Sequence, residues 1–238
     1  MRVDSSRFLR QEKLVPRKVL SDKTVAIIGL GGLGCPAAEY LGASGLGKIF
    51  LVDRDVVEIS NLNRQFLYSE RDVSKEKAKV AAKVLSGKYP DTEFFPVVGS
   101  SRDVLEASPS VVLDCTDNLE SRKDINSVFV GREIPVVYGS ALGWTGAVSS
   151  FVPGGFCLEC FLCGKGKDEA CETQGIVGPV AGAIGCLQAI DALKILSGKL
   201  KKPKGIRYFD FFSGENWLVK VTRDKNCRVC SKSGGRKK

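Results

Sequence analysis

The sequence predicts an α/β fold, in which a mixed, mostly parallel sheet carries helices on both faces and ends in an antiparallel C-terminal part. The first supporting observation is the alternation of short apolar runs with helix-like segments along the first half of the 238 residues. The second is a glycine-rich turn directly after the first apolar run. The third is a pair of C-x-x-C motifs late in the chain, which we expect to clip the antiparallel part as a four-cysteine zinc site.

The glycine-rich turn follows the first predicted strand, the apolar and largely β-branched run from Thr24 to Ile28. Gly29, Gly31 and Gly34 then fill the pattern G-x-G-x-x-G. Glycines let the backbone turn tightly and bring its N–H groups close to phosphate oxygens, and the following helix directs the positive end of its dipole at the same charge. The turn therefore predicts a nucleotide site; the alternative is that the glycines only allow close packing of helix and strand.

A helix over 33–44 and a strand over 48–52 complete a strand–turn–helix–strand unit around this turn. The second strand ends at Asp53, 19 residues after Gly34, which places its carboxylate to accept hydrogen bonds from ribose hydroxyls. With strand, helix and acid in order, the unit indicates a Rossmann-like fold more firmly than the glycines alone.

The rest of the chain continues the alternation of strands and helices. Ser74 is placed to cap the helix that follows it. On the last long helix, Leu187, Ile190 and Leu193 form the expected packing face, and the small residues there favour close helix contact, including contact across a dimer. We expect a helical arm over 5–20, a helix over 75–85, strands over 93–98 and 110–116 with a short acidic linker helix between them, and a helix over 119–130. After these we expect a fifth strand over 135–138, a strand over 144–152 that turns back antiparallel, a helix over 179–197, and strands over 206–212 and 217–221.

We expect a single domain over 1–223, since a chain of 238 residues suffices for one large α/β core. Its crossover loop covers about 161–177, and residues 224–238 form a zinc knuckle and a basic tail. Charged residues interrupt any apolar run at the N-terminus, which argues against a signal peptide. Two uncharged stretches, 134–158 and 173–190, contain several Gly, Pro and polar residues, so we interpret them as strands with turns and as a loop with a buried helix. We therefore expect a soluble, cytoplasmic protein with no membrane partner.

Most of the net charge of +9 lies in two short segments. Residues 199–207 carry five positive charges, and residues 224–238 carry six positive charges and one negative charge, so the rest of the chain is close to neutral. A nucleic-acid-binding surface would more often interleave basic and aromatic residues along one face. We therefore expect a solvated loop, a disordered basic tail and no nucleic-acid partner, although the tail could help to recruit an acidic protein.

The sequence contains no histidine, which excludes a Ser-His-Asp triad, a Cys-His pair, a histidine-bound metal and an imidazole base. Nine cysteines remain, and in a chain without a secretion signal they favour metal or thiol chemistry over disulfides. Cys157 with Cys160 and Cys227 with Cys230 form two C-x-x-C pairs, which are typical of a tetrahedral zinc site. A redox dithiol is the alternative, but it would normally follow a thioredoxin-like strand directly. We expect small core residues at Cys35, Cys115 and Cys186.

The loop over 55–69 has no clear period and lies next to the predicted nucleotide site. Its polar side chains are good donors for phosphate and ribose oxygens. On the residues alone, Lys77 is interpreted as one of several exposed lysines. The candidate donors of the loop are Asn61, Asn63, Arg64 and Gln65.

Asp117 follows the fourth predicted strand. Ligands of open parallel sheets collect at the carboxyl ends of the strands, so a carboxylate that binds Mg²⁺ is expected at this position. Asp117 could also cap the next helix together with Glu120, and the two roles are compatible.

These residues together resemble the MoeB/ThiF family, which is also the adenylation core of ubiquitin-activating enzymes. The resemblance runs from Arg7 to Cys230 and covers nearly the whole chain. The set of motifs is more specific than any one of them. The motifs are the arm RFLRQ, the turn GLGGLG, the acid pair in DRD, the loop SNLNRQ, Lys77, the strand end CTDN and the two C-x-x-C pairs.

The resemblance implies that ATP activates the C-terminal Gly-Gly carboxylate of a small ubiquitin-fold protein, giving an acyl-adenylate and pyrophosphate. It implies Mg²⁺ at Asp117, a structural zinc at the C-x-x-C cysteines, and a homodimer in which Arg10 reaches into the partner subunit's site. The implied nucleotide contacts are the phosphates at Gly29, Gly31, Gly32 and Gly34, the ribose at Asp53, the triphosphate at Asn61, Arg64 and Lys77, and further contacts at Asp55, Gln65, Asp117 and Asn118.

Adenylation fits the residue types of this chain. A carboxylate has to approach a polyanion, so the protein must mainly neutralise charge and align the attack with the departure of pyrophosphate. Arginine, lysine, backbone N–H groups and a metal do this without imidazole. The alternative from another class is a nucleotide-binding scaffold or a nicotinamide dehydrogenase. A dehydrogenase usually needs a side chain that donates a proton. Histidine is absent, and the Tyr-x-x-x-Lys arrangement is absent too, since none of the five tyrosines has a lysine four residues later.

Cys171 occupies the place where family members that form a thioester or an acyl-disulfide keep a reactive cysteine, and Cys163 is a second candidate. Acidic neighbours of Cys171 oppose a thiolate, whereas two nearby lysines favour it. No rhodanese-like extension follows Cys230, so we expect sulfur to come from a separate sulfurtransferase. Two pathways stay open: activation of a sulfur carrier for molybdopterin, thiamine or tRNA thiolation, and activation of a ubiquitin-like modifier that passes from Cys171 to a conjugating enzyme.

Overall fold

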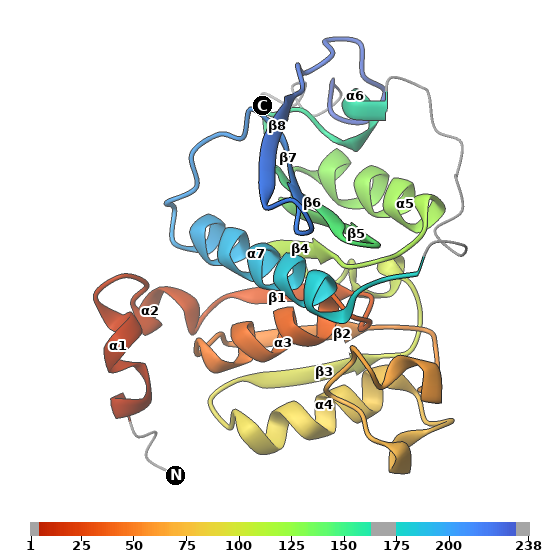
Figure 1. Ribbon diagram of the computed structural model, residues 1–238. Coiled ribbons are helices and arrows are strands. Elements are labelled where there is room, and N and C mark those ends of the chain that lie inside the picture. The colour runs from red at the N-terminus through yellow and green to blue at the C-terminus, as the bar shows by residue number, and fades with distance from the viewer. Residues whose placement is uncertain (1–4, 163–174, 232–238) are drawn as a thin grey trace.

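A computed structural model describes residues 5–162 and 175–231, which form a mixed sheet of eight strands with helices on both faces (Figure 1). The strand order is β3-β2-β1-β4-β5-β6-β7-β8. The strands from β3 to β5 in this order pair in parallel, and β6, β7 and β8 continue the sheet antiparallel, which confirms the predicted fold class. The strands are β1 (Thr24–Ile28), β2 (Lys48–Val52), β3 (Glu93–Val97), β4 (Val111–Asp114), β5 (Val136–Leu142), β6 (Thr145–Phe151), β7 (Gly205–Asp210) and β8 (Glu215–Lys220).

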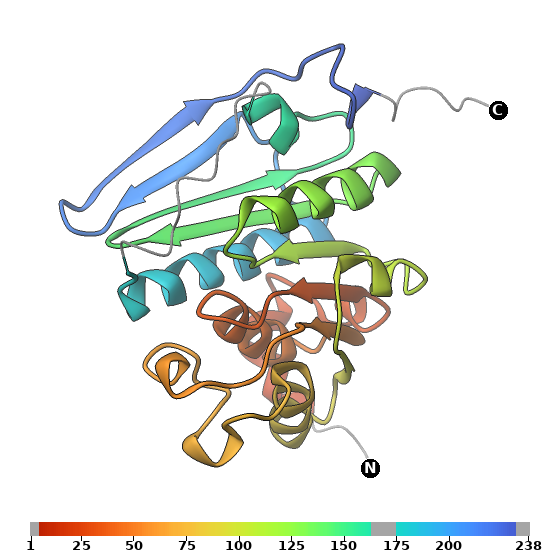
Figure 2. The same ribbon diagram turned by 90° about the vertical axis from the view of Figure 1, so that its right-hand side faces the viewer.

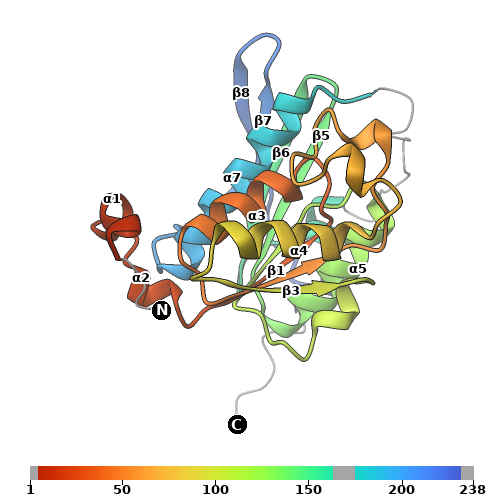
Figure 3. The same ribbon diagram turned by 90° about the horizontal axis from the view of Figure 1, so that it is seen from below.

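Helices α3, α4 and α7 cover one face of the sheet, and α5 covers the other (Figure 1 and Figure 3). The predicted N-terminal arm forms three short helical segments, η1, α1 and α2. The helical elements are η1 (Ser5–Phe8), α1 (Leu9–Glu12), α2 (Arg17–Leu20), α3 (Gly34–Ala43), η2 (Ile59–Asn61), η3 (Glu70–Asp72), α4 (Lys77–Lys88), η4 (Ser101–Val104), α5 (Leu119–Phe129), η5 (Val130–Arg132), α6 (Leu158–Leu162) and α7 (Gly178–Leu196).

The central strand β1 explains why the first apolar run is continuous rather than alternating. Val25 and Ile27 pack into the core shared with α3, α4 and α7, whereas Ala26 and Ile28 pack into the core under α5. Successive side chains of a strand point to opposite faces, so a strand covered on both faces needs apolar residues at every position.

The order of the strands creates a crevice at the carboxyl end of β1. The chain leaves β1 toward β2 and β3 on one side and returns to β4 on the other side, so β1 lies between β2 and β4. Ile28 at the end of β1 is in register with Asp114 at the end of β4. Ligands of open α/β sheets bind at such a switch in strand order. The glycine turn and the segment after β4 therefore meet at one edge of the sheet.

Helix α7 is apolar enough and long enough to cross a membrane by length and composition, but half of it is buried against the domain. It contacts α3, β4, β5 and β6, which makes it a core helix. Its buried side chains include Ile184 and Gln188, whereas Ile190 is 45% exposed. Ile190 lies about 200° around the helix from Gln188 and does not pack within the described part of its own chain, so its predicted contact across a dimer stays a prediction. Leu187 and Leu193 are partly buried against the core.

Two predicted helix caps are wrong. Ser74 has a left-handed backbone with φ of 68°, and α4 begins only at Lys77 after the N-cap residue Glu76. Asp117 does not cap α5, because Asn118 is the N-cap residue and its Oδ1 accepts a hydrogen bond of 2.9 Å from the Ser121 N–H. Cys35 and Cys115 are buried as predicted, but Cys186 is only half-buried.

Most of the predicted crossover loop lies outside the described residues, within 163–174. The same holds for Cys163, for Cys171 and for the basic tail from residue 232 onward.

Candidate functional site

The glycine turn between β1 and α3 has a shape that side chains would prevent. Gly29 has a φ of 89°, and a Cβ atom on it would lie 2.7 Å from the Cys115 carbonyl oxygen at the end of β4. A Cβ atom on Gly34 would lie 1.9 Å from the Gly29 carbonyl oxygen. Both glycines are therefore required by close backbone contact, and Gly29 also by its backbone conformation. The turn brings the backbone of β1, α3 and the end of β4 together.

The N-terminus of α3 is open toward this turn. Its N-cap residue Leu33 makes no capping hydrogen bond through its side chain. Among the described residues, the N–H groups of Gly31 and Gly32 have no hydrogen-bond acceptor. Unsatisfied N–H groups and the positive end of the helix dipole favour an anion at this place.

Asp53 is buried at the end of β2 and holds the backbone on both sides of the site. Its Oδ2 accepts a hydrogen bond of 2.7 Å from the Leu30 N–H, and its Oδ1 accepts one of 2.8 Å from the Asp55 N–H. Burial raises the pKa of Asp53, although these two N–H groups act to lower it. The carboxylate predicted to bind ribose thus already fixes the first peptide of the glycine turn, and its remaining lone pairs stay able to accept further hydrogen bonds.

Lys77 is buried at the start of α4, so the interpretation as an exposed lysine is wrong. Its Nζ lies 3.6 Å from Asp55 Oδ2, and its backbone N–H donates to the Asp55 carbonyl oxygen. A buried ammonium group needs a charged partner, and Asp55 is that partner for Lys77. The Asp55 side chain itself is 63% exposed. The pair therefore places one fixed positive charge next to Asp53.

The loop between β2 and α4 brings two more predicted residues to the turn. A Cβ atom on Gly32 would lie 3.5 Å from Arg64 Cδ and 2.9 Å from the Cβ atom of Ala181 on α7. Arg64 Nη1 donates to the Ser60 carbonyl oxygen at 2.9 Å. Gln65 is 3% exposed, and its Oε1 is a buried acceptor without a partner among the described residues. An unpartnered buried acceptor beside a row of free N–H groups fits a site that takes a polar ligand.

Asn61 and the pair after β4 complete the predicted set. Asn61 is buried, and its Oδ1 accepts a hydrogen bond of 3.1 Å from the Glu58 N–H, so it shapes the loop. Asp117 is exposed, and its Oδ1 accepts a hydrogen bond of 3.2 Å from Asn118 Nδ2. An exposed carboxylate at the end of β4 suits Mg²⁺, which prefers oxygen ligands and keeps several waters.

Arg10 does not belong to the site of its own chain. It is exposed on α1, and α1 lies on the left of Figure 1, whereas the loop between β2 and α4 lies on the right. The arm packs at the amino ends of the strands, because Arg7 donates to the Lys88 carbonyl oxygen and Arg17 lies 3.7 Å from Asp91 before β3. The glycine turn lies at the opposite, carboxyl edge of the sheet.

Sequence reasoning missed several residues that support the turn. Tyr68 and Cys35 both donate to the Leu30 carbonyl oxygen, at 2.9 Å and 3.2 Å. Gln188 on α7 is fully buried, and its Nε2 donates to the carbonyl oxygens of Asp114 at 2.7 Å and Val137 at 3.1 Å. A single amide in the middle of an apolar helix was the available signal for Gln188, because a buried amide needs partners. No comparable signal marked Tyr68 or Cys35.

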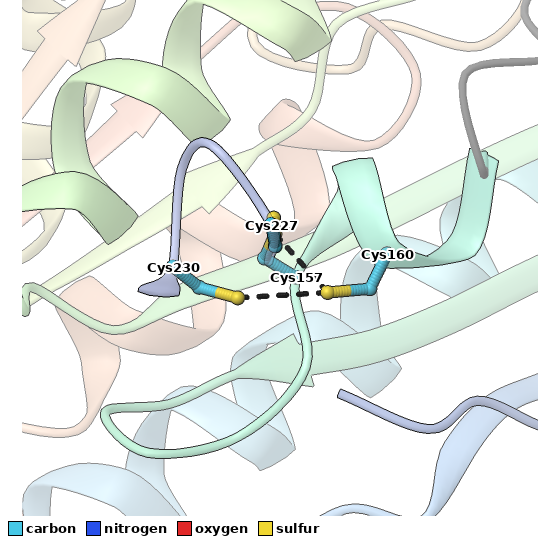
Figure 4. Close-up of side chains that lie close together, drawn as sticks. All are labelled: Cys157, Cys160, Cys227 and Cys230. Carbon is cyan, nitrogen blue, oxygen red and sulfur yellow. Dashed lines mark hydrogen bonds between the residues drawn. The ribbon is translucent and has the colours of Figure 1, made fainter. Parts of the chain in front are cut away.

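The four cysteines of the C-x-x-C pairs form a second, separate centre (Figure 4). Cys157 directly precedes α6 and Cys160 lies within it, and Cys227 and Cys230 follow β8. All four are buried, and their Sγ atoms lie within 4.8 Å of one another. The pairs Cys160–Cys230 and Cys157–Cys227 are 3.5 and 3.6 Å apart.

This geometry fits zinc. Four sulfurs at the usual zinc–sulfur distance of about 2.3 Å in a tetrahedron lie about 3.8 Å apart. The Asp224 N–H also donates to Cys160 Sγ at 3.4 Å, which is the kind of outer hydrogen bond that orients a thiolate ligand. The predicted four-cysteine centre is therefore formed by the residues that the sequence indicated.

A hollow of about 340 Å³ lies at the far end of α7 from the glycine turn. Its wall includes the basic segment 199–207 and the buried Asp191. Asp191 pairs with Arg207 at 2.6 Å and with Lys194 at 3.3 Å. The lysines of the segment are exposed, in agreement with the predicted solvated loop.

The model of the ThiF family matches residues 7–229, which include the glycine turn, the loop after β2, the end of β4 and three of the four centre cysteines. The chain belongs to the ThiF family. The family predicted from the motifs is thereby confirmed.

Three curated relatives of this ThiF-family chain match it over most of their own length. The sulfur carrier protein ThiS adenylyltransferase of Escherichia coli is 37% identical over 242 residues, covering 98% of this chain and 96% of the relative. The molybdopterin-synthase adenylyltransferase of the same organism is 35% identical, with 90% and 89% covered. The SAMP-activating enzyme E1 of Haloferax volcanii is 33% identical, with 96% and 88% covered.

Solved structures agree on the fold. The crystal structure of E. coli MccB has a TM-score of 0.82 at 21% identity and covers 96% of this ThiF-family chain and 73% of MccB. A crystal structure of MccB with ATP has a TM-score of 0.76 at 22% identity, with 90% and 68% covered. At these identities the likeness establishes the arrangement of elements.

Proposed function

We propose that this chain is an ATP-dependent adenylyltransferase that activates the C-terminal glycine of a small sulfur-carrier protein of the ubiquitin fold. The carboxylate oxygen of the carrier attacks the α-phosphorus of ATP, the bond between the α-phosphorus and the bridging oxygen breaks, and pyrophosphate leaves with the bonding electrons. The products are an acyl-adenylate and pyrophosphate, and no proton has to move. The observation that carries the proposal is the open α3 N-terminus in a chain 37% identical to an adenylyltransferase. Beside Arg64, the N–H groups of Gly31 and Gly32 have no acceptor within residues 5–162 and 175–231.

The chain's own residues would bind and orient the substrates. Free N–H groups at the glycine turn hold phosphate oxygens, while Arg64 and Lys77 offset their charge. Asp53 accepts from the ribose hydroxyls through lone pairs that the backbone leaves free. Asp117 would hold Mg²⁺, which supplies charge neutralisation of the phosphates when bound. The four centre cysteines would hold zinc in a structural role, since the sulfurs are buried and saturate a tetrahedron.

The carrier protein would approach along the turns that connect β5 to β6 and β7 to β8. Trp144 and Phe212 expose 51% and 79% of their surface and make an edge-to-face contact with ring centroids 5.9 Å apart. The neighbouring Gly143 pairs with the segment 175–177, which leads into α7 at Gly178. A Cβ atom on Gly178 would lie 3.2 Å from Arg64 Cβ. This exposed aromatic surface is therefore continuous with the proposed nucleotide site and suits a protein partner.

A homodimer would complete the site. Arg10 lies at the opposite edge of the sheet from the glycine turn of its own chain, so it can assist only the site of another copy. Helices α3 and α7 pack together and expose Tyr40 and Ile190, which are 60% and 45% exposed. A two-fold axis on this face would set the arm of one copy against the turn of the other. Cytoplasmic location and the lack of nucleic-acid and membrane partners stay predictions.

A second candidate is activation of a ubiquitin-like modifier that Cys171 carries as a thioester to a conjugating enzyme. The identity of 33% to an enzyme named as SAMP-activating E1 favours it. Trapping the carrier on the enzyme distinguishes the two: a reductant-sensitive adduct that disappears in Cys171→Ala supports a thiol step, and its absence in the wild type contradicts one.

Pyrophosphate exchange tests the adenylation itself. Labelled pyrophosphate should enter ATP only when a carrier ending in Gly-Gly is present, and Asp117→Ala should lower the exchange rate at least tenfold. Asp103→Ala is the matched control, because this acid is exposed at η4 and should leave exchange unchanged. Exchange that needs no carrier, or that is equal in both variants, would contradict the proposal.

A further inference from the structure

We propose that Tyr68 and Cys35 are positioning residues for the nucleotide phosphates, because they hold the Leu30 carbonyl and so direct the Gly31 N–H into the phosphate site. The proposal rests on the function above and adds to it two residues that contact no substrate. Three hydrogen bonds join Leu30 to Asp53, which accepts, and to Tyr68 and Cys35, which donate; we call them the Leu30 clamp.

The clamp holds both peptide units of Leu30. The Leu30 N–H donates to Asp53 Oδ2 at 2.7 Å, which fixes the peptide between residues 29 and 30. The Leu30 carbonyl oxygen accepts from the Tyr68 hydroxyl at 2.9 Å and from Cys35 Sγ at 3.2 Å, which fixes the next peptide. Leu30 and Cys35 are buried, and Tyr68 is 7% exposed, so water does not compete with these bonds.

The geometry of the peptide unit after Leu30 determines where the Gly31 N–H points. In a trans peptide the C=O of one residue and the N–H of the next point in opposite directions. The described residues contain no cis peptide bond. Since the Leu30 carbonyl points into the core at Tyr68 and Cys35, the Gly31 N–H points away from the core. The Gly31 N–H is also one of the two N–H groups of the turn that have no acceptor among the described residues.

Both donors keep their protons under ordinary conditions. Burial raises the pKa of Cys35 to about 12, and burial also raises the pKa of Tyr68 above its usual value. The hydroxyl and the thiol therefore stay neutral donors at neutral pH. The clamp does not loosen through titration, so its strength depends on the side chains present.

A purely packing role does not account for the hydroxyl of Tyr68. Phenylalanine would fill the same core volume without placing a polar group there, and a buried hydroxyl without a partner is unfavourable. The hydroxyl instead reaches the one carbonyl that sets the direction of the Gly31 N–H. Two donors on one carbonyl also leave the bond from Cys35 in place when the hydroxyl is removed.

The test compares ligands with and without phosphates. We expect Tyr68→Phe to weaken ATP binding by about 3- to 10-fold, the loss that one buried hydrogen bond supports, and to leave adenosine binding unchanged. Adding Cys35→Ala should weaken ATP binding further, again without an effect on adenosine. Titration calorimetry with ATP and with adenosine measures both constants, and thermal unfolding monitors the fold of each variant.

Tyr89→Phe provides the matched control. Its hydroxyl donates to Glu39 at 2.9 Å, far from the turn, so the variant loses a tyrosine hydroxyl bond without touching the clamp. It should bind ATP as the wild type does. Equal ATP binding by the wild type and Tyr68→Phe, or a parallel loss of ATP and adenosine binding, would overturn the clamp alone. A wild type that binds neither ligand would overturn both the clamp and the proposed function.

Discussion

The parallel part of the sheet, β1 to β5, and the antiparallel part, β6 to β8, are held in shape by different means; we call them the parallel end and the antiparallel end. At the parallel end, the glycine turn is fixed by backbone contacts that leave no room for a Cβ atom and by the Leu30 clamp. At the antiparallel end, β8 is the edge strand of the sheet (Figure 2), and all six of its residues are exposed. This edge strand therefore adds no buried side chain of its own, and four sulfurs join the chain after β8 to α6.

This difference shows how stability is distributed over the molecule. The Leu30 clamp joins residues no more than 38 positions apart in the sequence, whereas the cysteine centre joins segments 70 residues apart. Closing a long loop removes much entropy from the unfolded chain, so a long-range clip can stabilise an edge strand whose residues are all exposed. We expect the stability of the antiparallel end to depend on zinc binding, and the shape of the parallel end to depend on the glycines of the turn.

Removal of the centre should have the largest effect on stability. In Cys227→Ser with Cys230→Ser, zinc content should fall to zero, and the midpoint of thermal unfolding should fall by about 10 °C, which corresponds to roughly 4 kcal/mol for a chain of this size. Hydrogen exchange should increase in β7 and β8 and stay unchanged in β1 and β2.

The matched control for the double variant is Cys186→Ser, a half-buried cysteine outside the centre. It should keep its zinc and lose little stability. Zinc retained in the double variant would contradict the four-cysteine assignment, and an equal increase in exchange at both ends of the sheet would remove the contrast between them.

Gly34→Ala should have the next largest effect, at the parallel end. The new Cβ atom would lie 1.9 Å from the Gly29 carbonyl oxygen, a backbone atom that cannot move aside without opening the turn. We expect a loss of about 3 kcal/mol in the free energy of unfolding and no detectable ATP binding. Zinc content should be normal, because the cysteine centre lies on other elements.

Gly87→Ala is the control for Gly34→Ala, since a Cβ atom on this helical glycine meets no atom within 4 Å. It should be neutral or slightly stabilising, as Gly→Ala is within a helix. If Gly34→Ala binds ATP normally, the turn is not the rigid element that the structure indicates.

The sequence predicted the elements well where a local pattern determined them. The run from Thr24 to Ile28 and the run over 48–52 have the predicted bounds, because continuous apolar residues suit only a strand covered on both faces. The cysteine centre was also predictable, since the spacing of C-x-x-C pairs reflects the geometry of one metal.

Predictions failed where contacts between residues distant in the sequence determine the burial or the role of a side chain. Lys77 is buried and paired with Asp55 in the loop after β2, and neither local charge nor helical period indicates that contact. Asn118 caps α5 instead of Asp117, although both types suit the position, since the chain reaches extended geometry one residue later. The Leu30 clamp joins α3 to three loop residues, so no spacing in the sequence indicates it.

The smallest expected effect concerns thiol chemistry and tests the rigidity of the parallel end. Alkylation needs a thiolate, and a raised pKa lowers the thiolate fraction at any pH below it. Burial raises the pKa of Cys35 to about 12, so at pH 8 its thiolate fraction is roughly 10⁻⁴. We expect iodoacetamide at pH 8 to label the half-buried Cys186 of the native protein well before Cys35.

Mass spectrometry of the labelled peptides measures the two rates, and labelling in urea, where both thiols are exposed, is the control. Cys35 should react there at an ordinary rate. In the native protein it should react only through global unfolding, because its thiol is bonded to the Leu30 carbonyl inside the core. Equal native rates for Cys35 and Cys186 would mean that the glycine turn opens locally, and the parallel end would then be the less rigid of the two.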